Sequence, residues 1–261
     1  MARRALLTTM IAASLVLPLG PVRSQEAAHR VLVFSRTTGF RHDSIPDGIA
    51  AVRSIGQQQG FEVQATEDPS FFADDRLAGF DAVVFLLTTG DVLDDGQQAA
   101  LQRYIGRGGG FVGVHSASDT EHAWPWYGEL VGAFFVGHPA IQGASVFVTD
   151  RVHASTRDLP ERWDRTDEWY NFDANPRTKV HVLAHVDEST YSGGSMGSDH
   201  PISWCRFFDG GRTWYTAMGH TRESYSEALF VRHLAGGIRF AAGYPDCDSP
   251  AARPRALPPR S

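Results

Sequence analysis

The stretch at residues 108–120, GGGFVGVHSASDT, joins an apolar run to an abrupt polar ending. Residues 111–114 predict a buried strand, and the small residues Gly113 and Ala117 lie two positions before and two positions after His115. Small residues at these positions are typical of a sharp strand-to-helix turn that lifts the central side chain out of a sheet. A serine or cysteine nucleophile is usual at the centre of such a turn, and here the residue is a histidine.

The chain before this turn alternates between strands and helices. Continuous apolar blocks at residues 30–35, 61–65 and 81–87 predict strands that are buried on both faces. Helices are expected from Ser44, as N-cap, to about residue 59 and from Asp94 to the glycines before residue 111. This order favours an α/β fold with a mostly parallel sheet and helices on both faces. The chemistry of such sheets lies beyond the carboxyl ends of the strands, which here means the loops at residues 36–43, 88–91 and 115–119.

The second half of the chain is less regular and richer in aromatic residues. We expect strands at residues 144–148 and 180–184, a strand or loop edge at 167–172, a hairpin formed by 202–208 and 212–217, and a last helix at 223–242. No internal repeat or change of composition marks a second domain. Residues 25–244 are therefore expected to form one domain, followed by a disordered Pro/Arg-rich tail at residues 245–261.

The first residues have the pattern of a secretory signal peptide. Arg3 and Arg4 precede an apolar run, and small residues stand before a cleavage site at Ser24, so residues 1–24 are expected to be removed. The arginine pair leaves both the general and the twin-arginine export routes open. The mature protein is expected to be secreted or periplasmic, with no membrane attachment after cleavage.

The composition of the mature chain excludes one class of partner. Removal of three arginines leaves 21 basic and 30 acidic side chains, a formal net charge of −9. Nucleic-acid binding requires a density of Lys and Arg that this chain lacks. In an oxidising compartment Cys205 and Cys247 could form a disulfide, although two unpaired thiols are equally compatible with the sequence.

Histidines at predicted strand ends are the first candidates for a functional site. Five of the eleven histidines lie there in polar or glycine-rich surroundings: His42, His115, His138, His200 and His220. Histidine is the commonest transition-metal ligand and an acid or base near neutral pH, and Asp167 and Glu168 offer oxygen ligands or a general base. The alternative is that these histidines cap loops and bind nothing.

Aromatic residues in the loops provide a second indication. Trp124, Trp126, Trp169 and Tyr170 lie in the sequence near these histidines and carboxylates. Flat apolar faces beside polar groups suit sugar rings, whereas local packing is the alternative use of such residues. We expect the three tryptophans to line the mouth of a site. The residues expected to contact substrate are these four aromatic residues together with Arg41, Thr89, Ser116, Asp119, His138 and His200.

Seven motifs follow one another between Thr37 and His220: TTGFRHDSIPDG, GGGFVGVHSASDT, WPWYGELVGAFF, HPAIQ, DEWYNF, DHPISW and GRTWYTAMGH. Together they resemble the trehalose-utilisation (ThuA-like) family. One departure is Ala154 after His153, where the family pattern leads us to expect proline. The resemblance implies a flavodoxin-like, doubly wound sheet similar to that of the class I glutamine amidotransferases, and a role in sugar metabolism, including the processing of keto-disaccharides.

The resemblance also sharpens the significance of His115. In the amidotransferases the central residue of the turn is a cysteine that attacks a glutamine amide. His115 replaces it, and neither cysteine lies near the predicted turn, so amide hydrolysis by a thiolate is excluded.

Two functions are open at this point. The first is an enzyme that acts on a glycoside or keto-sugar as an isomerase, epimerase or lyase, with His115, His42, Asp167, Glu168 and His220 as catalytic residues. A divalent metal such as zinc, held by His42, His115 and His220, would polarise a keto-sugar carbonyl and favour proton abstraction at the neighbouring carbon. The second is a sugar-binding module that retained an amidotransferase cavity without its nucleophile. Convergent histidines favour the enzyme, because a binding module has no need of them.

Overall fold

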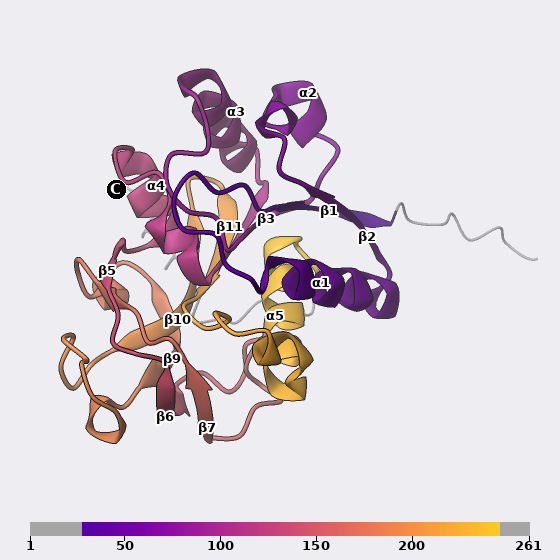
Figure 1. Cartoon of the computed structure of the whole chain (residues 1–261). Coiled ribbons are helices and arrows are strands. Elements are labelled where there is room, and N and C mark those ends of the chain that lie inside the picture. The colour runs from indigo at the N-terminus through magenta and orange to yellow at the C-terminus, as the bar shows by residue number, and fades with distance from the viewer. Residues whose placement is uncertain (1–27, 246–261) are drawn as a thin grey trace, which may run out of the picture.

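A nine-stranded sheet runs through the structure, a computed structural model that describes residues 28–245 (Figure 1). The strand order is β2-β1-β3-β4-β11-β10-β9-β6-β7. The strands are β1 (His29–Phe34), β2 (Phe61–Thr66), β3 (Ala82–Leu86), β4 (Gly110–Val114), β6 (Gln142–Val148), β7 (Arg162–Asp167), β9 (His181–Val186), β10 (Pro201–Phe208) and β11 (Gly211–Thr216). A separate pair is formed by β5 (Phe135–Gly137) and β8 (Asn171–Phe172).

The half of the sheet that contains the N-terminal strands is parallel, as the apolar blocks predict. The strands β2, β1, β3, β4 and β11 pair in the same direction. Every residue of β3 and β4 is buried, because helices cover both faces of this half and leave no face for polar side chains. The buried blocks thus fix where the loops after β1 and β4 leave the sheet.

The other half is antiparallel, so the expectation of a mostly parallel sheet is not confirmed. The β10–β11 hairpin reverses the chain direction, and β9, β6 and β7 continue the alternation. The sheet is mixed, with four parallel and four antiparallel neighbour pairs among residues 28–245. The sequence of β7, RWDRTD, is polar, which conceals this strand from a search for apolar blocks.

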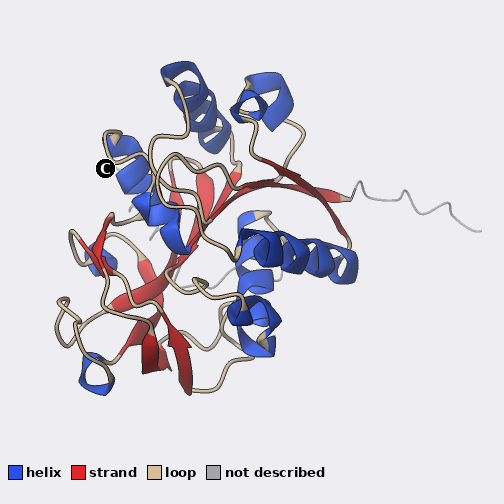
Figure 2. Cartoon of the chain, in the orientation of Figure 1, coloured by secondary structure: helices blue, strands red, loops and turns tan. Residues whose placement is uncertain are grey.

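Helices lie on both sides of the sheet (Figures 1 and 2). One side carries α1 (Ile45–Gln59) and α5 (Ala228–Ala241), and the other carries α2 (Asp74–Leu77), α3 (Asp95–Gly106) and α4 (Pro125–Val131). Asp94 caps α3 in a capping box with Gln97, as its position predicts. Ser44 makes no side-chain cap of α1; its hydroxyl donates instead to the carbonyl oxygen of His220 at 2.7 Å. The start of α1 is therefore joined to the loop after β11.

Several expectations fall outside the described residues. They are the signal peptide at residues 1–24, the tail from residue 246 onward, and Cys247 with its disulfide. Cys205 is buried in β10. Among residues 28–245, no helix has the length and apolar character needed to cross a membrane.

A buried histidine in α5 makes the stability of the fold sensitive to acid. Burial lowers the pKa of His233 to about 3, whereas an unfolded chain gives histidine a pKa of about 6.5. Below pH 6.5 the unfolded state binds a proton that the folded state excludes. The free energy of unfolding therefore has its full value above pH 6.5 and decreases as the pH is lowered toward 3. We expect a loss of about 1 kcal/mol per pH unit from this one group. In urea titrations from pH 7 to pH 4, His233→Gln should show a shallower decline than the wild type, and equal slopes would contradict this assignment.

Candidate histidine–carboxylate site

One edge of the sheet gathers the ends of four strands. The loops after β1, β4 and β11 leave the sheet at the same edge because these strands are parallel. The antiparallel alternation from β11 to β7 turns β7 back to the same direction, so its carboxyl end also lies there. These four ends carry His42, His115, His220 and Glu168.

The turn after β4 has the predicted form. His115 has φ of +52°, a left-handed conformation that non-glycine residues rarely adopt and that often marks functional sites. A Cβ atom at Gly113 would lie 2.9 Å from the Tyr215 side chain and 3.2 Å from the Cβ atom of Ala117. Close packing around the turn thus explains the small residues on either side of the histidine. The helical segment that follows, His115–Asp119, is a single 3₁₀ turn.

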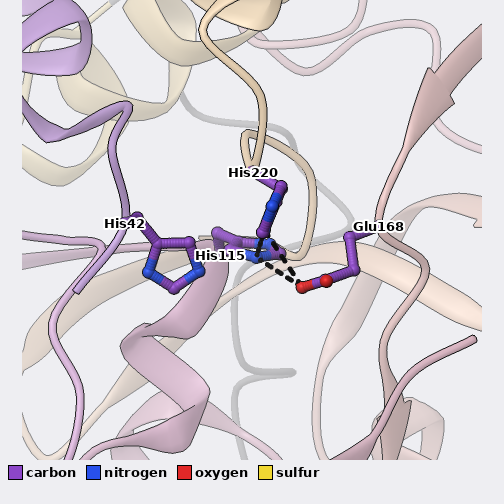
Figure 3. A group of neighbouring side chains, drawn as sticks. All are labelled: His42, His115, Glu168 and His220. Carbon is purple, nitrogen blue, oxygen red and sulfur yellow. Dashed lines mark hydrogen bonds and ion pairs between the residues drawn. The ribbon is translucent and has the colours of Figure 1, made fainter. Parts of the chain in front are cut away.

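The four side chains at this edge converge on one point (Figure 3). One ligand atom from each of His42, His115, Glu168 and His220 lies within 4.8 Å of the other three. His115 Nε2 is 3.2 Å from His220 Nδ1 and 3.3 Å from Glu168 Oε2, and His220 Nδ1 is 3.1 Å from the same oxygen. We call this set the histidine cluster. All but His220 are buried.

A backbone carbonyl fixes the tautomer of His115. Nδ1 of His115 is 2.6 Å from the carbonyl oxygen of Ala217. A carbonyl oxygen only accepts, so Nδ1 carries the hydrogen and donates it. Nε2, the other ring nitrogen, then faces Glu168 and His220. Ligating histidines in metal sites are held by the same kind of contact.

The charges in the histidine cluster are interdependent. Burial alone would raise the pKa of Glu168, but hydrogen bonds and charge from His115 and His220 outweigh it and hold that pKa well below its usual range. Burial likewise works against the charged form of His220, and the Glu168 carboxylate overcomes it and raises the pKa of His220. Burial, followed by the charges of His115 and His220, lowers the pKa of His42 to about 3. His42 is therefore a neutral ligand or base at neutral pH.

Two further residues of the predicted set lie against the cluster. His138 Nδ1 is 3.0 Å from Glu168 Oε1, the carboxylate oxygen that faces away from His115 and His220. Its side chain is 41% exposed, so it lies between the buried cluster and solvent. The ring of Tyr170 packs on His115 with centroids 4.1 Å apart and is buried.

Asp167 lies beside the cluster but not within it. Its carboxylate accepts from the backbone N–H groups of Gly219 at 2.8 Å and His220 at 3.1 Å, and it pairs with buried Arg165. Arg165 in turn donates to Glu227, before α5, at 3.0 Å. This chain of contacts holds the loop that presents His220. Asp167 thus lies behind this loop and not among the four converging side chains.

An open cleft of about 480 Å³ leads to the cluster. His42 and His220 form part of its lining, and Arg41 lies on the same wall, where it makes a two-pronged contact with Glu67 at 2.7 and 3.1 Å. Six further residues line the cleft and were not predicted from the sequence: Phe40, Asp43, Ser44, Ile141, Thr221 and Arg222. Arg165 was not predicted either, although its spacing of two from Asp167 places both on one face of β7.

Four residues expected to contact substrate make hydrogen bonds to neighbouring loops or lie beside the histidine cluster. Thr89 Oγ1 donates to the Phe40 carbonyl at 2.7 Å, and Asp119 Oδ1 is 3.0 Å from His122 Nε2. His200 is buried and donates from Nε2 to the Tyr170 carbonyl at 2.8 Å. Ser116 Oγ lies 3.5 Å from His42 Nδ1, at the limit of a hydrogen bond.

The three tryptophans do not line the mouth. Trp169 is buried, and its Nε1 donates to the Gln142 carbonyl at 2.9 Å. Trp126 Nε1 donates to Asp209, in the turn before β11, while Trp124 stacks on Trp126 with centroids 5.0 Å apart. Asp209 precedes β11 and His220 follows it. Trp124 and Trp126 therefore lie near the end of β11 that is opposite the histidine cluster. All three tryptophans occupy positions set by packing and hydrogen bonding, which loop sequences alone do not reveal.

The chain belongs to the ThuA family, described as trehalose utilisation, whose model matches residues 30–241. The fold is glutamine-amidotransferase-like, and His115 lies in the turn after β4. A ThuA-like protein from Bacteroides uniformis is similar in structure, with a TM-score of 0.71, 22% identity, and coverage of 85% of this chain and 94% of that one. One from Parabacteroides merdae has a TM-score of 0.68 and 19% identity, over 83% and 91% of the two chains.

More distant structures share the fold alone. A β-galactosidase from Bacillus circulans has a TM-score of 0.53 and 13% identity, and the match covers 81% of this chain and 31% of that enzyme. No curated protein sequence matches the chain.

Proposed function

We propose that the chain is an exported enzyme that acts on a glycoside or keto-sugar, as an isomerase, epimerase or lyase, with a divalent metal in the histidine cluster. The observation that carries this proposal is the convergence of three imidazoles and one carboxylate on one point at the end of a cleft. Membership of a trehalose-utilisation family supports a carbohydrate as the small-molecule partner.

The donor set fits zinc or a similar ion. Four ligands in a tetrahedron with bonds of about 2.0–2.1 Å lie roughly 3.3–3.4 Å from one another. The three contacts among His115, His220 and Glu168 measure 3.1 to 3.3 Å, and His42 completes the set within 4.8 Å. A bound cation would displace protons held among these nitrogen and oxygen atoms, so metal affinity is expected to fall at low pH.

The residues around the cluster fit proton transfer next to a carbonyl group. The ion, when bound, would polarise a substrate carbonyl and lower the pKa of the adjacent C–H group. His42, His115, His220 and Glu168 would hold the ion. His138 lies outside this set, is partly exposed and contacts Glu168, so we assign it to take the proton from the substrate and to return it. Tyr170 packs on His115 and excludes water from that side.

The turn after β4 carries no thiol that could act as a nucleophile on an amide. His115 stands there, and Cys205, the cysteine among residues 28–245, is buried in β10.

Elemental analysis combined with a substrate screen tests the proposal. The mature protein, purified without metal chelators, should contain about one equivalent of zinc or a similar ion. It should convert keto forms of glycosides in a screen that also includes the parent glycosides, and His138→Gln should retain the metal and lose turnover. Sugar binding by a metal-free protein without turnover of any compound would instead identify a sugar-binding module.

A further inference from the structure

The cleft beside the histidine cluster is unusual in presenting apolar side chains to solvent. Within residues 28–245, only four large hydrophobic side chains are exposed, namely Phe40, Val136, Ile141 and Val152. Two of these four, Phe40 at 65% and Ile141 at 45% exposure, line this one cleft. Two exposed apolar side chains that share a cleft next to a candidate reaction site indicate a binding surface.

Phe40 is held in place by its backbone. The carbonyl oxygen of Thr89 accepts from the N–H groups of Thr38 at 2.9 Å and Gly39 at 3.4 Å, and Thr89 Oγ1 donates to the carbonyl of Phe40 itself. The phenyl ring stands edge-on to the ring of His42, with centroids 4.8 Å apart and an angle of 84°. The ring therefore abuts the cluster while much of its surface remains open.

Ile141 is fixed in a similar way. Its neighbour Gln142 donates from Nε2 to the carbonyls of Ala140 at 3.0 Å and Ser192 at 2.9 Å, and accepts from Ser192 N–H at 3.0 Å. The Gln142 carbonyl accepts from Trp169 Nε1. Two apolar side chains on immobilised segments thus share a cleft with the polar Thr221 and Arg222. Surfaces that are ordered before binding lose little entropy when a ligand arrives.

We infer that Phe40 and Ile141 form a subsite for a ring-shaped substituent of the substrate, a group with an apolar face and a polar edge next to the group that reacts. A pyranose ring has both features, and an aryl ring shares the apolar face. The polar edge would face Thr221 and Arg222. This inference rests on the proposed function for the identity of the reacting part. The protein would then bind a substrate with two rings more tightly than one in which the second ring is replaced by a small substituent.

Binding of three compounds with a common glucosyl part tests the subsite. Methyl α-glucoside has no second ring, phenyl α-glucoside has an aryl ring, and trehalose has a second sugar ring. We expect at least one of the two ring compounds to bind the wild-type mature protein about three- to tenfold more tightly than the methyl compound. The tighter of the two identifies the kind of ring. In Phe40→Ala/Ile141→Ala this preference should disappear, and in Val152→Ala, a change at an equally exposed side chain outside the cleft, it should remain.

Equal affinity for all three compounds, absence of binding, or a preference that persists in the double variant would overturn the inference. Zinc affinity of the same proteins separates it from the proposed function, because neither substituted side chain is a ligand in the cluster. A wild type that prefers ring compounds but binds no zinc would count against the metal site and leave the subsite intact.

Discussion

Zinc affinity is expected to fall by more than about 100-fold when His115 is replaced. Residues that merely orient a ligand typically account for 10- to 100-fold in affinity, and His115 would be a direct ligand whose Nε2 faces Glu168 and His220. Turnover of a keto-glycoside should be lost with the metal. His115→Asn is the variant of choice, because asparagine tolerates the left-handed backbone of this turn better than alanine does.

The control for this experiment is His185→Asn, which removes a half-exposed imidazole of β9 outside the cluster. It should bind zinc as the wild type does, and both variants should unfold cooperatively in thermal denaturation. A folded His115→Asn protein with wild-type zinc affinity would remove His115 from the ligand set.

The second large effect is expected at Arg165, which is not itself a ligand in the cluster. Its guanidinium joins buried Asp167 to Glu227 and packs over the rings of Trp163 and Phe230. Arg165→Met keeps much of the side-chain volume but leaves the Asp167 carboxylate buried without its cation, which typically costs about 3–5 kcal/mol. For a protein of this size that corresponds to a fall in Tm of roughly 10 °C.

A matched change on the same strand distinguishes this effect from a general sensitivity of β7. Arg162 is exposed and pairs with Asp164, so Arg162→Met should change the free energy of unfolding by no more than about 0.5 kcal/mol. Because Asp167 also holds the N–H groups of Gly219 and His220, Arg165→Met should weaken zinc binding at temperatures where it is folded, and Arg165→Lys should restore part of it. Unchanged zinc affinity in folded Arg165→Met would leave Arg165 a purely structural role.

The loops that carry three of the four cluster residues could be predicted from the sequence. The apolar blocks of β1 and β4, together with the hairpin that contains β11, locate the strand ends after which His42, His115 and His220 follow. The choice between Asp167 and Glu168 could not be made from their order alone. Alternation along β7 buries Trp163, Arg165 and Asp167 on one face, so the next residue is free to point toward the histidines.

Other features depend on contacts that no local pattern reveals. The polar strand β7 is held by ion pairs of Arg165 with Asp167 and Glu227 as well as by Trp163, and it contains no apolar block from which a strand could be predicted. Trp169 reads as a loop aromatic suited to a sugar, but its indole is needed to fill the core and to hold Gln142.

The wide spacing of the cluster residues along the chain has a thermodynamic consequence. His42 and His115 come from the first half of the chain, and Glu168 and His220 are delivered by segments that meet them only in the completed sheet. No short segment holds all four, so an unfolded chain offers an ion only scattered, weak ligands. An ion that binds the folded state alone shifts the equilibrium toward it by mass action, by about 2.7 kcal/mol at a concentration 100 times its Kd. Occupancy of the cluster would therefore also protect the whole domain against unfolding.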